Sequence, residues 1–104
     1  MSFDIMHGEQ LDGCYRVNLW GEIDILAAHA GDEAVDGLRH SHCSDVVVGL
    51  SGVRMLDAAG TGFLVDLHRI ASDRGGRLLV RGPRPVVLRV LVLTRFRELI
   101  DIAP

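Results

Sequence analysis

Several features are scarce in this 104-residue sequence, and each scarcity excludes a class of protein. No apolar run reaches the ~18 residues that a membrane-spanning helix needs, so we expect no membrane insertion. The first ten residues, MSFDIMHGEQ, lack the basic and apolar regions of a secretory signal. Two cysteines are present, Cys14 and Cys43, and they fit no metal or redox spacing. These absences predict a cytoplasmic protein with free thiols.

Positive charge is also scarce. The 11 basic side chains face 14 acidic ones, which gives a net charge of −3 and a pI near 5.9. Nucleic acids and anionic membranes attract proteins with a basic field, so we expect neither as a partner. Lysine is absent, and the Gly60–Gly62 stretch lacks a third glycine, so it matches neither a P-loop nor a dinucleotide-binding motif.

What is present is ordinary globular composition, with 48% hydrophobic and 24% charged residues. A chain of this length can bury roughly two-thirds of its unfolded surface and forms one core. We therefore expect a single domain over residues 1–104.

The first half of the chain predicts a hairpin followed by a helix. Residues 14–20 alternate apolar and polar side chains, as a half-buried strand does, and should pair with an edge strand at 3–6 across a turn at 8–13. From residue 26 the spacing becomes helical, with a narrow apolar stripe formed by Leu26, Ala30, Ala34 and Leu38. Residues 40–45 are expected to form a loop.

The second half predicts two further strand–helix units. Residues 46–50 form an unbroken apolar run typical of a buried strand, and an amphipathic helix follows until the Gly75-Gly76 pair. A strand at 77–81 precedes a helix at 86–93, with Pro85 in its first turn, and a short strand closes the chain near 99–102. The order ββαβαβαβ predicts an α/β fold with a mixed sheet of about five strands flanked by three main helices.

The junction from Asp57 to Gly62 joins the buried strand to its helix. A helix N-terminus favours anions, and small side chains allow a partner's backbone to approach closely. Asp57 is expected to act as the N-cap. The same residues would also suit a helix start that binds nothing, so the pattern alone leaves both interpretations open.

Several motifs in this order resemble the STAS family, specifically bacterial anti-sigma factor antagonists. They are GEID at 21–24, LSGV at 50–53, LDAAG at 56–60, GG at 75–76 and VLVLTRF at 90–96. The resemblance implies a mixed sheet flanked by helices and a partner that is an anti-sigma factor and a serine kinase. In that family, phosphorylation of a serine just before the central glycine switches binding off.

By this resemblance, the partner-binding surface comprises Asp24, Asp57, Ala58, Ala59, Gly60 and Thr61. The phosphoacceptor position falls on Ala59, which cannot be phosphorylated, and Gly49 replaces an aspartate common in the family. The hydroxyl of Thr61 is a substitute acceptor candidate, although a threonine there more often hydrogen-bonds back into the first helical turn.

Other functions are less well supported. One alternative is a STAS module that binds a nucleotide or another anion at Gly60, or an adapter subunit of a transport or signalling complex. His40, His42 and Cys43 lack a fourth zinc ligand at a clear spacing, so we expect a polar loop and no metal. No nucleophile and base stand at recognisable positions, so we expect neither an enzyme nor a cofactor.

The last helix offers a second candidate interface. On a helical wheel, Val87, Val90, Leu91 and Thr94 share the face expected to pack on the sheet. Leu88 and Val92, at i and i+4, lie on the opposite side and should be exposed. Such a pair can seed a weak homodimer or a contact with a second partner.

Overall fold

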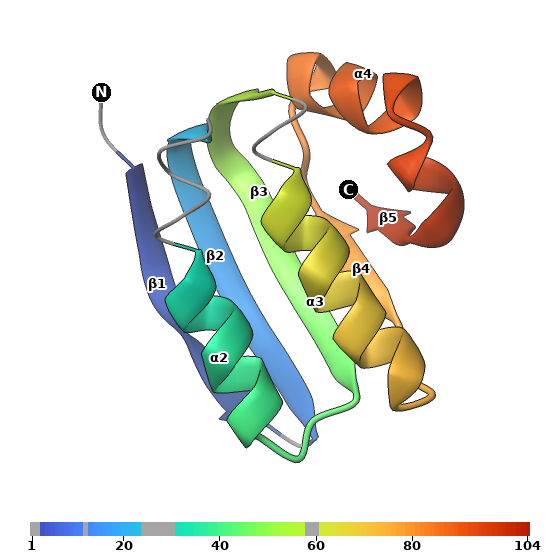
Figure 1. Cartoon of the computed structure of the whole chain (residues 1–104). Coiled ribbons are helices and arrows are strands. Elements are labelled where there is room, and N and C mark those ends of the chain that lie inside the picture. The colour runs from blue at the N-terminus through green and yellow to red at the C-terminus, as the bar shows by residue number, and fades with distance from the viewer. Residues whose placement is uncertain (1–2, 12, 24–30, 58–60) are drawn as a thin grey trace.

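The computed structural model describes residues 3–11, 13–23, 31–57 and 61–104. Its core is a five-stranded sheet in the order β1-β2-β3-β4-β5 (Figure 1). Strand β1 is antiparallel to β2, and β2 to β5 run parallel. The strands are β1 (Phe3–Leu11), β2 (Cys14–Ile23), β3 (Asp45–Leu56), β4 (Leu78–Arg81) and β5 (Asp101–Ala103). The helices are α2 (Asp32–His40), α3 (Gly62–Asp73), α4 (Pro85–Leu93) and the 3-10 helix η1 (Phe96–Leu99). The predicted α/β class and mixed sheet are confirmed.

Two strands are longer than the sequence pattern indicated. Strand β1 continues through Gly8 to Leu11, so the predicted turn at 8–13 is wrong in its extent. The register shifts between Met6 and Glu9, and this irregularity accommodates the glycine inside the strand. Strand β3 extends past Leu50 to Leu56 because the alternation persists, with Val53 buried and Arg54 exposed.

Helices α2 and α3 lie side by side on one face of the sheet (Figure 1). Tyr15 of β2 donates its hydroxyl hydrogen to the carbonyl of Ala34, 3.1 Å away, which ties α2 to the sheet. His40 belongs to α2 and not to the predicted loop. Of the predicted apolar stripe, Ala34 and Leu38 are buried, whereas residues 26 and 30 lie outside the described residues.

The C-terminal ends of α2 and α3 are joined by Arg74. Its guanidinium donates to the carbonyls of Leu38, Cys43 and Arg39 at 2.6–2.9 Å. Gly75 then adopts φ +76°, and Gly76 N donates to Ala71 O at 2.8 Å. This is the left-handed cap that the glycine pair predicted.

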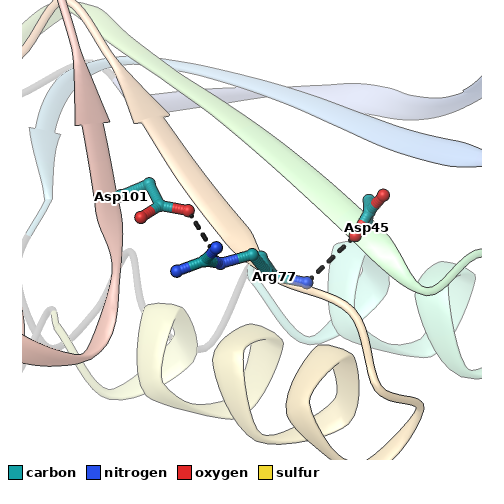
Figure 2. Close-up of polar contacts among 3 residues, drawn as sticks. All are labelled: Asp45, Arg77 and Asp101. Carbon is teal, nitrogen blue, oxygen red and sulfur yellow. Dashed lines mark hydrogen bonds and ion pairs between the residues drawn. The ribbon is translucent and has the colours of Figure 1, made fainter.

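Strand β4 is held between its neighbours by polar contacts of Arg77. Its backbone N–H donates to Asp45 Oδ1 at 3.0 Å, and its Nε lies 3.0 Å from Asp101 Oδ2 (Figure 2). The closing strand was predicted near 99–102, but β5 begins at Asp101 and Leu99 belongs to η1.

Helix α4 lies beyond the carboxyl ends of the parallel strands, where it contacts β3 and η1 (Figure 1). Pro85 is its first residue, and Val87 and Leu91 are fully buried, as expected. Thr94 is exposed, and its hydroxyl donates to Val90 O at 2.8 Å, so its placement on the buried face was wrong. Thr94 is the C-cap residue, beyond the last residue of α4, and its hydroxyl turns back to the helix.

A candidate binding surface beside helix α3

The β3–α3 junction presents one exposed carboxylate before the helix. Asp57 is exposed, and its backbone carbonyl accepts a hydrogen bond from Thr61 N at 3.1 Å. This bond has the i→i−4 spacing of an α-helix, so the chain already turns before α3. The structure describes α3 from Gly62, with Thr61 before it, and the Thr61 side chain makes no capping hydrogen bond. The backbone groups that an Asp57 cap would bond belong to residues 58–60, outside the described residues, so the Asp57 cap stays a prediction.

Four predicted site residues lie outside the described residues: Asp24, Ala58, Ala59 and Gly60. Asp57 and Thr61, which the structure describes, flank residues 58–60 in the sequence, whereas Asp24 is far from them along the chain. The partner-binding surface therefore stays a prediction.

Thr61 is only 6% exposed and borders a surface cleft of about 330 Å³. We call this the Thr61 cleft, and its lining residues are Thr61, Val65, Thr94, Arg95, Phe96, Glu98 and Leu99. It brings the start of α3 next to the segment that follows α4, more than thirty residues later in the chain. Sequence reasoning did not predict this C-terminal wall.

The C-terminal wall of the Thr61 cleft, formed by residues 94–99, has little uncompensated charge. Arg95 Nε lies 3.8 Å from Glu98 Oε2, and Phe96 is buried against the core. The edge ring contact of Phe96 with His68, at 5.9 Å between centroids, helps to fix this wall against α3. The cleft can therefore accept polar backbone groups without favouring one sign of charge.

Exposed aliphatic side chains stand on the same C-terminal segment as the cleft wall. Leu93 is 74% exposed, Leu99 59% and Val92 51%. We call these three residues the apolar ridge. Leu88 is half-buried, so the predicted Leu88–Val92 pair is exposed only at Val92. The apolar run at 90–93 already indicated that a residue such as Leu93 would be exposed. A helix at the end of a sheet cannot bury four consecutive side chains.

The histidine and cysteine cluster has ordinary structural surroundings. His40 Nδ1 lies 2.8 Å from Asp36 O, and Cys43 is buried in the core. Within residues 3–11, 13–23, 31–57 and 61–104, no three His, Cys, Asp or Glu side chains are grouped to hold a metal ion. Over those same ranges, no helix has the length and apolarity to cross a bilayer.

The family described as "Mlab, STAS domain" matches residues 6–101. This chain belongs to the STAS domain family. The match covers every described element from β2 to η1, so the resemblance of the motifs to the STAS family is confirmed.

Similar STAS proteins include named anti-sigma factor antagonists. The anti-sigma-B factor antagonist of Bacillus subtilis is 26% identical over 95 residues, which cover 91% of this chain and 86% of that protein. The structure of an anti-sigma factor antagonist from Mycobacterium paratuberculosis superposes with a TM-score of 0.84 at 25% identity, covering 99% of this chain and 86% of the other. The structure of SpoIIAA in its unphosphorylated form has a TM-score of 0.79 at 17% identity and covers 99% and 89%, which shows the shared fold.

Proposed function

We propose that this STAS domain is a regulator of the anti-sigma factor antagonist type, which binds an anti-sigma factor that is also a serine kinase. The near full-length similarity to a protein named anti-sigma-B factor antagonist carries this proposal. The apolar ridge supports it, because Leu99 lines the Thr61 cleft, and Val92 and Leu93 are exposed aliphatic residues on the helix just before the cleft wall; exposed apolar area of this kind is typical of a protein-binding surface.

The proposed surface has two parts. The first is the junction of Asp24, Asp57, Ala58, Ala59, Gly60 and Thr61. The second is the apolar ridge of Val92, Leu93 and Leu99. Small junction residues allow close backbone approach, and the ridge supplies apolar area whose burial favours association. Asp57 at the rim orients a basic partner and raises the association rate more than the affinity.

Binding by this chain is constitutive in our proposal. Ala59 has no hydroxyl, so a kinase cannot phosphorylate the position that the family resemblance marks. Thr61 is a poor substitute because its side chain is almost fully buried and a kinase must enclose its acceptor. The partner would therefore be held whether or not ATP is present.

The test is to mix the chain with serine-kinase anti-sigma factors from the same genome, with and without ATP. We expect complex formation in both conditions and no mass increase of the chain by intact mass spectrometry. Ala59→Ser should gain one phosphate with ATP and lose most of its binding, whereas Ala71→Ser, at a fully buried position, should gain none. A stoichiometric phosphate on the unsubstituted chain, at Thr61 or Ser51, would overturn the constitutive binding.

Two alternatives make different predictions for the same samples. A nucleotide-binding module at Gly60 would show a rise in melting temperature with ATP or GTP alone, which our proposal does not require. An adapter would be captured from the native host with subunits of a transport or signalling complex and with no kinase.

A further inference from the structure

A second surface depression lies on the sheet face opposite α2 and α3. Along β2, β3 and β4, fully buried residues on the helix side alternate with exposed or half-buried residues on this side. Parallel strands are usually covered on both faces, so a polar face on a mainly parallel sheet is unusual. The depression has a volume of about 400 Å³. Its lining residues are Arg16, Asn18, Val47, Gly49, Ser51, Arg81, Gly82 and Pro104. We call it the arginine groove.

Glycine forms the floor of the arginine groove. Asn18, Gly49 and Arg81 stand in one row across β2, β3 and β4. Because Gly49 has no side chain, the amide of Asn18 reaches over it, and a Cβ built on Gly49 would collide with Asn18 Oδ1. Gly82, with φ +64°, turns the chain at the end of β4, and a Cβ there would lie 3.2 Å from Ser51 Cβ. The hollow depends on both glycines.

Positive charge gathers around this floor. Arg16 and Arg81 come from the strands on either side of β3 and are offset by two residues along it, at Val47 and Gly49, so their backbones are roughly 12 Å apart at the usual strand spacing and rise per residue. Glu9 of β1 is the register partner of Arg16, whereas Arg81 lies opposite Gly49. Among the described side chains, neither arginine makes an ion pair, whereas Arg77 and Arg95 each pair with an acid. Arg84 adds a third guanidinium near Ser51, fixed by a 3.0 Å hydrogen bond from its Nε to Ser51 O.

We propose that the arginine groove binds a compact polyanion, a small molecule carrying phosphate or carboxylate groups. Guanidinium groups form short, paired hydrogen bonds with these anions. Bringing Arg16 and Arg81 toward one anion relieves the repulsion between them, and the Asn18 amide and Ser51 hydroxyl supply further hydrogen bonds. The groove volume falls in the range of small-molecule sites, roughly 300–1,000 Å³. This site is separate from the Thr61 cleft and does not depend on the proposed partner.

The experiment is a titration of the ¹⁵N-labelled full chain with pyrophosphate and, separately, with citrate at constant ionic strength. We expect saturable amide shifts centred on Asn18, Gly49, Ser51 and Gly82. Arg16→Gln combined with Arg81→Gln should weaken binding at least tenfold. Arg69→Gln, at an exposed position of α3 on the other face, is the matched control and should bind as the unsubstituted chain does. Gly49→Ala should also weaken binding, because it displaces the Asn18 amide.

Each outcome decides the proposal. Tighter binding of pyrophosphate than of citrate assigns phosphate as the recognised group, and the reverse assigns carboxylate. The proposal is overturned if neither anion gives a saturable shift, if the double variant binds within threefold of the unsubstituted chain, or if Arg69→Gln weakens binding as much as the double variant. Melting curves of all variants show whether each is folded at the titration temperature.

Discussion

The Thr61 cleft and the arginine groove are depressions of similar size, about 330 and 400 Å³, but their chemistry differs. In the cleft, the Arg95 and Glu98 side chains compensate each other, and an exposed aliphatic ridge stands on the same segment. In the groove, Arg16 and Arg81 flank a glycine floor and make no ion pair with any side chain that the structure describes, although Glu9 stands opposite Arg16 on β1. The difference in lining, and not in volume, is the reason for proposing a protein partner at the cleft and a small anion at the groove.

The contrast begins in the sequence, where charge is unevenly distributed. Residues 74–104 contain seven arginines against two acids, whereas residues 1–73 contain four arginines against twelve acids. A net charge of −3 thus conceals a basic C-terminal segment, whose strand β4 lies beside β3 and is separated from β2 by that strand. Two or three convergent arginines suit a small anion but lack the extended basic field that nucleic acid requires.

The largest effect is expected from Leu91→Ala, on the buried face of α4, the helix that carries Val92 and Leu93 of the ridge. Leu91 is fully buried, so we expect the free energy of unfolding to fall by about 2–5 kcal/mol. Urea denaturation measures this loss. If the two surfaces are independent, pyrophosphate affinity of the folded variant should remain unchanged at low temperature. A selective loss of anion binding would contradict their separation.

The second-largest effect is expected from a variant that should impair partner binding at the apolar ridge and leave the arginine groove intact. Leu93→Asp with Leu99→Asp places charge on two exposed ridge positions, and we expect partner affinity to fall about 100-fold, or nearly 3 kcal/mol. Isothermal titration with the anti-sigma factor measures the loss. Melting temperature and pyrophosphate binding should stay the same because both side chains are exposed.

Val86→Asp is the matched control for the ridge variant. Val86 is on the same helix and is 53% exposed, close to the exposure of Val92, but it stands at the other end of α4. We expect partner affinity to change less than threefold. Equal losses in the control and the ridge variant would show that the whole helix, and not the ridge, is the interface.

The fold was more predictable from sequence than either surface. Local chemistry was enough for the Gly75-Gly76 cap and for Pro85 at the start of α4, since each depends on backbone geometry that few residues can adopt. Both depressions are lined by residues from distant segments of the chain, such as Thr61 and Leu99 or Arg16 and Arg81. Periodicity indicates which side of an element is polar, but it does not indicate which two elements meet. The half-buried Leu88 is an example, because only the position of α4 decides its exposure.

The smallest effect is expected at Arg95, the one non-glycine residue with positive φ, 63°, among those described. It follows α4 at the position where helices commonly carry glycine, and a side chain in this conformation costs about 1–2 kcal/mol. Arg95→Gly removes that cost but also increases the entropy of the unfolded chain and deletes an exposed ion pair worth about 0–1 kcal/mol. We expect unfolding free energy to rise by less than about 1 kcal/mol, measured by urea denaturation. Arg95→Ala keeps the positive φ while deleting the pair, so it should be neutral or slightly destabilising. Partner affinity should be unchanged in both variants if the ridge, and not the charge of Arg95, makes the contact; a tenfold loss in both would transfer the interface from the ridge to the guanidinium.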